Sequence, residues 1–286
     1  MKNYFILPGL YSLQKLNLGI RTLFKTNSNF FYPNIYIQQV FGSLPNAIWN
    51  GDKLAFSRYQ PLSHDIVDIL QEYVRNGLQV IFNFNNSAIT ENDCDNVYCN
   101  ILMQLGLSIN LNTQCSVNSR ILYEYLLNTY PQLNNIYLGV NNSIPAENTE
   151  PLHYFLNPIH NGDTEYLKSL KFKPNIVITL NPLCLGCGNR EECILKENLA
   201  QLNYDPHTAK INTCNVLKYK DYNLSKDKFN SSIIPEYNSL GFSHFCLEEY
   251  PTLEENLEEY LFFLIKPEYY YQAKEFLLHF MEEHKK

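Results

Sequence analysis

The sequence lacks an apolar run long enough to cross a bilayer. A membrane helix needs about 20 consecutive apolar residues, and the longest candidate, residues 260–265, lies between Glu259 and Lys266. The N-terminus also lacks the extended apolar core of a secretory signal, because Pro8 and Gly9 interrupt its short apolar run. We therefore expect a cytoplasmic protein with no membrane segment.

The chain has little positive charge. Its 22 Lys and Arg residues are outnumbered by 29 Asp and Glu residues, which leaves a net charge of -7 at pH 7. A large basic surface of the kind that binds nucleic acid is therefore not expected, although a local basic groove is compatible with this composition.

The common signatures of hydrolytic enzymes are missing as well. The sequence contains no G-x-S-x-G nucleophile elbow, no H-E-x-x-H zinc motif and no convincing order of Ser, His and Asp. A peptidase is therefore the least favoured of the functions considered below.

What the sequence does contain is a repeated alternation of β-rich and helical patterns. Strands are expected at residues 35–41, 79–84, 107–111, 135–140, 154–156, 176–180 and 242–247, and helices at residues 63–77, 97–105, 119–130 and 164–170. This order predicts a mainly parallel sheet with right-handed crossovers. The number of units favours an α/β fold of the TIM-like (β/α) barrel type, complete or irregular, in a single domain over residues 1–286.

The C-terminal part, from about residue 251 to residue 286, departs from this alternation. Two helices are expected there, at residues 253–265 and 268–280, because Pro267 cannot continue the first one. Their apolar spacing fits helices that pack on the barrel.

Several of the expected strands end in asparagine. Asn85 with Asn86, Asn112, Asn157 and Asn181 each follow such a strand. In a barrel, the carboxyl ends of the strands meet at the rim that carries active sites. Asparagine is also a favoured turn residue, so a structural role is the alternative for each of them. We select Asn85 and Asn181 as candidate catalytic residues.

The most distinctive segment is a group of cysteines after the strand expected at residues 176–180. Cys184, Cys187 and Cys193 form the spacing C-x2-C-x5-C, and Cys214 follows after twenty further residues. Thiolates are soft ligands that suit zinc or iron-sulfur clusters. Clustered thiols in a chain without an export signal bind metal or do chemistry more often than they form disulfides. We take these four cysteines as the candidate metal ligands.

Two groups of residues complete the interpretation of the cysteines. Cys246 is the second choice for the fourth ligand, and Arg190 could pair with the charge of a bound cluster. Cys94, Cys99 and Cys115 fall in or near helical segments, so we interpret them as small core residues.

Two residues are candidate acids or bases. His207, between Cys193 and Cys214, could donate a proton, replace a ligand or have no role beyond its loop. Glu248 follows the last expected strand and could serve as a general acid or base at the rim, the alternative being a surface glutamate.

The cysteine spacing does not identify the metal. It differs from the C-x3-C-x2-C of radical enzymes that use S-adenosylmethionine and from the paired C-x2-C of zinc ribbons. An iron-sulfur cluster is the main expectation, zinc is the alternative, and a segment without metal is the third reading.

Four separate segments, taken together, resemble one protein family. They are residues 40–45 with 49–51, residues 82–86 with 89–91 and 98–100, Asn181 with the cysteine segment, and residues 241–248. The resemblance is to the collagenase-like peptidase family of unknown catalytic type, and its short pieces are spread over residues 35 to 250.

This resemblance implies a TIM-like barrel with an oxygen-sensitive 4Fe-4S cluster on four cysteines. Several members resemble oxygen-independent hydroxylases that act on RNA bases or quinone precursors, and others are described as peptidases. The chain departs from the family in its narrower cysteine spacing and at Cys246, where relatives tend to have lysine. Glu249 and Tyr250 also stand where relatives have Gly-Arg.

We therefore expect an iron-sulfur-dependent redox modification enzyme, similar to those hydroxylases, that acts on an unidentified small molecule or RNA base and uses a redox partner. The first alternative is a non-catalytic binding or assembly protein in which a structural zinc site stabilises a loop of the barrel. The second is a peptidase-like protein.

Overall fold

The computed structural model describes residues 1–51, 55, 57, 61–133, 135–140, 153–182, 190–205 and 233–284, without the side chains of residues 190 and 191. Eight parallel strands form a closed barrel in sequence order, and the last strand pairs with the first. The strands are β1 (Asn3–Leu7), β2 (Ile35–Gly42), β3 (Gln79–Phe84), β4 (Gln114–Val117), β5 (Ile136–Leu138), β6 (Tyr154–Phe155), β7 (Ile176–Thr179) and β8 (His244–Cys246). The predicted TIM-like barrel is therefore confirmed.

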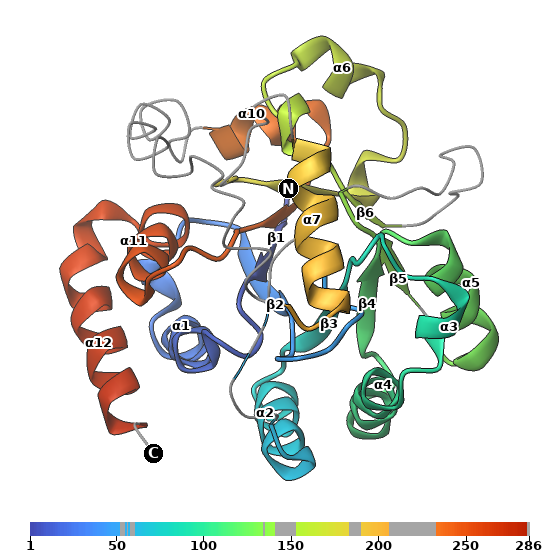
Figure 1. Ribbon diagram of the computed structural model, residues 1–286. Coiled ribbons are helices and arrows are strands. Elements are labelled where there is room, and N and C mark those ends of the chain that lie inside the picture. Colours follow the sequence, from blue (N-terminus) through green and yellow to red (C-terminus); the bar gives the residue numbers. More distant parts are fainter. Residues whose placement is uncertain are drawn as a thin grey trace.

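Helices surround the strands (Figure 1). The α-helices are α1 (Gln14–Thr26), α2 (Ser63–Arg75), α3 (Glu91–Cys94), α4 (Val97–Ile109), α5 (Arg120–Thr129), α6 (Thr164–Ser169), α7 (Arg190–Leu202), α10 (Ile233–Leu240), α11 (Leu253–Leu264) and α12 (Tyr270–Glu283). Short 3-10 helices are η1 (Ser28–Phe30), η3 (Pro158–His160), η4 (Lys173–Asn175) and η6 (Pro267–Tyr269). None of the helices in the described ranges is both long and apolar enough to cross a membrane.

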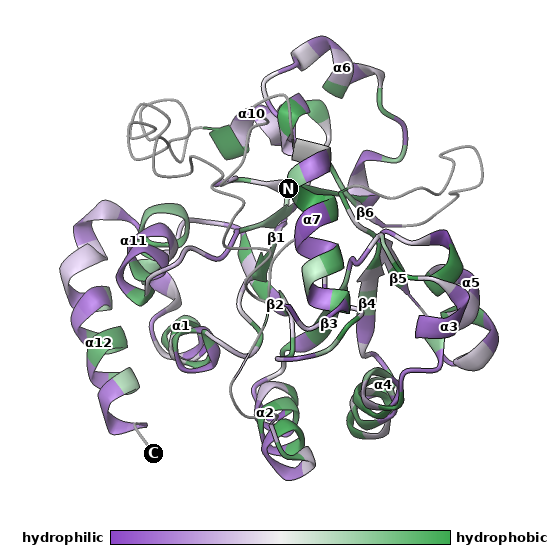
Figure 2. Ribbon diagram, in the orientation of Figure 1, coloured by the Kyte–Doolittle hydropathy of each residue, from purple (hydrophilic) through white to green (hydrophobic). Residues whose placement is uncertain are grey.

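The barrel separates two hydrophobic cores because side chains alternate across each strand. On β3, Phe82 and Phe84 point outward into the large core beneath the helices, whereas Ile81 points into the barrel. The inner core joins residues of six strands: Ile6, Ile81, Tyr137, Phe155, Val177 and Cys246. Figure 2 shows the corresponding mixture of hydrophobic and hydrophilic residues on helices such as α2 and α12.

Strand β1 was missing from the sequence prediction, which treated the start of the chain as a short apolar run. It pairs with β2 on one side and β8 on the other, so it closes the barrel. The strand ends at a turn in which Gly9 takes a positive φ of 70°, a conformation that side chains disfavour. The glycine that interrupts the apolar run thus marks the end of a real strand.

The strand predicted at residues 107–111 is wrong. Helix α4 continues through these residues to Ile109, and β4 begins only at Gln114. Gly106, directly after the helix predicted at residues 97–105, lies inside α4 at a close contact. A Cβ atom there would come within 2.7 Å of the Phe82 ring and 2.8 Å of the Thr113 side chain. The glycine therefore permits close packing of the helix on β3.

The two C-terminal helices pack on the barrel as expected. Helix α11 follows β8, and η6 with Pro267 separates it from α12. Helix α12 lies against α1, where a Cβ atom on Gly19 would come within 3.2 Å of Leu277 and 3.1 Å of Phe280. Phe31 and Ile265 form an antiparallel bridge that ties this segment to the loop before β2.

Candidate functional site

The carboxyl ends of the strands carry a ring of buried, uncharged polar side chains. All are less than one tenth exposed, and they come from β3, β4, β7 and the residues that follow them: Asn83, Asn85, Ser116, Asn118, Thr179 and Asn181. This end of a (β/α) barrel is where catalytic residues lie in barrel enzymes. Because buried polar groups are costly unless hydrogen-bonded, the partners of these side chains indicate which groups remain open to a ligand.

Asn85 is the best oriented of these side chains. The Ser116 hydroxyl donates to Asn85 Oδ1 at 2.7 Å, and Asn118 Nδ2 donates to the Asn85 main-chain oxygen at 2.9 Å. No acceptor within the described part of the chain receives a hydrogen bond from Asn85 Nδ2. The predicted residue therefore presents a fixed amide donor at the barrel mouth.

Gly139, directly after β5, makes room for this arrangement. A Cβ atom on Gly139 would lie 2.4 Å from Asn85 Oδ1 and 2.2 Å from Asn118 Oδ1. Such distances are far inside van der Waals contact, so any side chain at this position would displace both amides.

Asn83 and Asn118 were not among the predicted site residues. Asn83 Nδ2 donates to the Gly51 carbonyl at 2.8 Å and to Ser43 Oγ at 3.2 Å, which joins β3 to the loop after β2. Asn83 and Asn85 share one face of their strand, and this spacing of two residues is visible in the sequence. Asn118 could not be found in the same way because the sequence analysis expected this strand at residues 107–111, before the observed β4.

Asn181 and Glu248 lie together, as their predicted positions at two neighbouring strand ends require. Asn181 Oδ1 accepts from the Glu248 main-chain nitrogen at 2.6 Å, and Asn181 Nδ2 donates to the Glu248 carbonyl at 3.3 Å. This reciprocal pair fixes the residues after β7 to those after β8. Asn181 thereby positions Glu248, whose side chain is half-buried.

Cys246 lies inside the barrel next to the polar ring. It is 4% exposed, and its Sγ is 3.5 Å from Thr179 Oγ1. The other described cysteines outside the cysteine segment are buried, and burial raises the pKa of Cys94 to about 11 and that of Cys99 and Cys115 to about 12. These three thiols are protonated core residues, as interpreted from the sequence.

Helix α7 crosses the mouth of the barrel. Asn198 Nδ2 donates to Ser87 Oγ at 2.9 Å, and Asn86 Nδ2 donates to the Asn198 carbonyl at 3.0 Å. Gln201 Nε2 donates to the Ala47 carbonyl at 3.0 Å. Helix α7 follows β7 in the chain but is held by the loops after β2 and β3. Because β3 stands opposite β7 in the closed barrel of eight strands, the helix spans the mouth. Figure 1 accordingly shows α7 in front of the strands.

The predicted metal ligands fall mostly outside the described residues. Cys193 is half-buried in the first turn of α7. Cys184, Cys187 and Cys214 lie outside the described residues, as does His207, and of Arg190 only the main chain is described. Over the described ranges, no group of three or more His, Cys, Asp or Glu side chains is arranged to hold a metal ion.

A cluster of histidine and tyrosine side chains lies at the opposite end of the barrel, where the strands begin. The His244 ring stacks on Tyr4 with centroids 4.8 Å apart, and the His153 ring is 6.0 Å away. Burial, and then the charge of His153, lowers the pKa of His244 to about 4, and burial lowers the pKa of His153. Both imidazoles are therefore neutral at pH 7.

Two comparisons with known proteins found no match. No protein-family model matches the chain. No curated protein matches it either.

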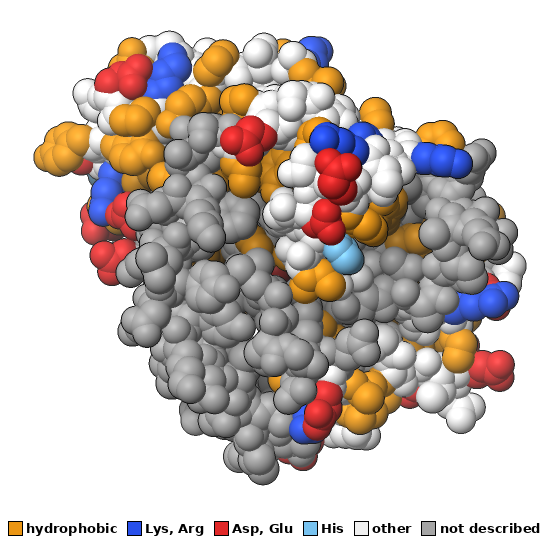
Figure 3. All heavy atoms as spheres, turned by 90° about the horizontal axis from the view of Figure 1, so that it is seen from above, with side chains coloured by type: hydrophobic (Ala, Val, Ile, Leu, Met, Phe, Trp, Pro, Cys, Tyr) orange, Lys and Arg blue, Asp and Glu red, His pale blue; other side chains and the backbone are white. Residues whose placement is uncertain are grey.

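Figure 3 shows the face that lies at the top of Figure 1. The charged side chains coloured there lie singly or beside side chains of the opposite charge, and they do not form one basic patch.

Proposed function

We propose that the mouth of the barrel is the active site of an iron-sulfur-dependent redox modification enzyme, similar to oxygen-independent hydroxylases. One observation carries the proposal: α7, which begins within the cysteine segment, is anchored across the mouth. Strand β7 ends at Thr179 at the same mouth, so the cysteine segment connects two elements that are held at the end of the barrel carrying Asn85 and Glu248.

The donor chemistry supports a thiolate-bound cluster. Cys184, Cys187 and Cys193 would supply three soft ligands, and Cys214 is our choice for the fourth. Cys246 is less suitable because its side chain packs among Val177, Phe155 and other members of the inner core. A bound cluster would supply one-electron transfer at the mouth, and the Arg190 side chain would pair with its charge.

The hydrogen bonds around the mouth support the roles that we propose for its residues. Asn85 Nδ2 would donate to an oxygen acceptor on the substrate, because Ser116 fixes the opposite side of the amide. Glu248 would hold or move a proton on the substrate, in the position set by Asn181. His207 remains a second candidate proton donor.

Metal analysis of anaerobically purified protein tests the proposal. We expect ~4 iron and ~4 acid-labile sulfide per chain and a brown chromophore that fades in air. One zinc per chain, with unfolding on chelation, would instead select the structural zinc protein. Colourless protein without iron after anaerobic purification would refute the proposed function.

A further inference from the structure

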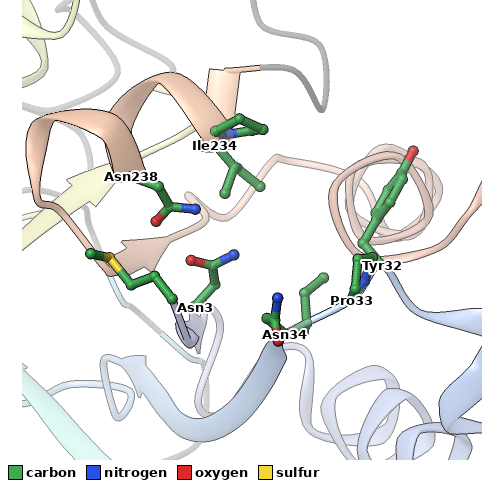
Figure 4. A pocket seen from close by; sticks show the side chains of 9 residues that line it. Asn3, Tyr32, Pro33, Asn34, Ile234 and Asn238 are labelled. Carbon is green, nitrogen blue, oxygen red and sulfur yellow. The ribbon is translucent and has the colours of Figure 1, made fainter.

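A pocket lies far from the mouth, at the end of the barrel where the strands begin. Its volume is about 240 Å³. It is lined by Met1, the first residues of β1 and β2, the loop between Tyr32 and Asn34, and helix α10. Figure 4 shows the side chains that line it, with Ile234 and Asn238 descending from α10 toward Asn3. None of the proposed catalytic residues lines this pocket.

The walls combine apolar side chains with three carboxamides. The apolar surface comes from Met1, Tyr32, Pro33, Ile35, Ile234 and Pro235, and the amides come from Asn3, Asn34 and Asn238. No lining residue has a charged side chain. A ligand that carries a full charge would lose its hydration without gaining an ionic partner from these side chains, so the lining favours a neutral ligand.

The amide oxygens of Asn3 and Asn238 are buried without a hydrogen-bond partner in the described part of the chain. Asn3 is 6% exposed, yet neither its Oδ1 nor that of Asn238 has a hydrogen-bond partner. Figure 4 shows both amides at the cavity. An unsatisfied buried polar group costs roughly 1–3 kcal/mol, so each amide gains from a partner that enters the pocket.

We propose that this pocket binds a small neutral molecule made of an apolar body and a carboxamide group. Each asparagine presents a donor beside an acceptor, and a carboxamide presents the complementary acceptor beside a donor. The apolar body would lie between Ile234 and the ring of Tyr32. This combination of apolar walls and a few placed polar groups is typical of small-molecule sites.

Benzamide is a suitable probe because it joins a planar apolar ring to one carboxamide. Binding to the full chain would be measured by ligand-detected NMR and by titration calorimetry, with benzoate as the charged analogue of the same shape. Asn238→Leu removes one amide at similar volume, and Ser239→Ala, at the next and exposed position on α10, is the matched control. Asn3→Leu tests the other amide if the first variant is unstable.

We expect saturable binding of one benzamide per chain, at least tenfold weaker in N238L and unchanged in S239A. Benzoate should bind at least tenfold more weakly than benzamide to the unmodified chain. The proposal is overturned if benzamide does not saturate, if N238L binds it as well as S239A does, or if benzoate binds more tightly. Ordered water would then be the partner of the two amides. Metal content does not enter this assay, so its outcome is independent of the function proposed for the mouth.

Discussion

Acid should destabilise the barrel through His244. This imidazole lies at the start of β8, stacked on Tyr4 and near His153, and burial lowers its pKa from 6.5 to about 4. The unfolded chain binds a proton at this residue below pH 6.5, whereas the folded chain does not until pH 4 is approached. The contribution of His244 is therefore fully present above pH 6.5 and is lost as pH falls.

The magnitude follows from the size of the shift. One pKa unit corresponds to about 1.4 kcal/mol, so the linkage amounts to about 2 kcal/mol at pH 5 and about 3 kcal/mol at pH 4. The lowered pKa of His153 acts in the same direction. Part of the shift of His244 is opposed by a hydrogen bond with the backbone of Pro174, which is included in its value of about 4.

Urea unfolding at pH 7, 6 and 5 measures this effect. His244→Phe retains an aromatic ring beside Tyr4 but cannot bind a proton. When the pH falls from 7 to 5, the unfolding free energy of the unmodified chain should therefore decrease by about 2 kcal/mol more than that of H244F. His64→Ala, which changes an exposed histidine, is the control and should follow the unmodified chain. The reasoning fails if H244F and the unmodified chain lose stability in parallel.

Three further substitutions test the packing of the mouth. Gly139→Ala should lower the unfolding free energy by about 1–3 kcal/mol in urea titrations, because its Cβ would overlap two amides, whereas Gly162→Ala, with nothing within 4 Å, should change it little. Asn181→Ala should cost about 1–3 kcal/mol in the same assay, since the main chain of Glu248 loses two hydrogen bonds to the Asn181 amide; no loss would contradict the reciprocal pair. Asn198→Ala should increase amide hydrogen exchange within α7 without a comparable increase in α2, and uniform exchange would contradict its anchoring role.

The parts of the fold with regular side-chain patterns could be predicted from sequence. Strand β3 was predicted with its observed bounds because a run of buried β-forming residues follows a helix that ends at a glycine. Helix α5 was predicted at residues 119–130, close to its observed bounds, and Ser119 caps it with a hydroxyl that accepts from Leu122 N. Strand β4 was misplaced because Gly106 serves packing, and a packing glycine looks the same in sequence as a helix stop.

Helix α7 was not predicted, and its buried face is mixed. Ile194 and Ala200 are buried there, but so are Asn198 and Gln201, which bond to loops, while Leu195 and Leu199 are 47% and 41% exposed. A periodicity argument assumes that apolar residues face the core. Here the helix covers a polar mouth, so the assumption fails at the element that lies over the candidate site.

The candidate site was partly accessible from sequence. The strand-end rule located Asn85, Asn181 and Glu248 at one end of the barrel. It could not distinguish Asn85, with its open donor, from Asn181, whose amide holds a neighbouring strand, because that difference depends on contacts between distant parts of the chain. The metal assignment of the cysteine segment stays a prediction.

Iron content in a ligand variant tests the central claim most directly. Cys193→Ser changes a proposed ligand in the first turn of α7, and Cys94→Ser changes a buried thiol that we assign to the core. Purified anaerobically, C94S should keep the iron and sulfide of the unmodified chain, whereas C193S should lose most of both while still folding. Equal iron in the two variants, or none in the unmodified chain, would contradict a cluster held at the mouth of this barrel.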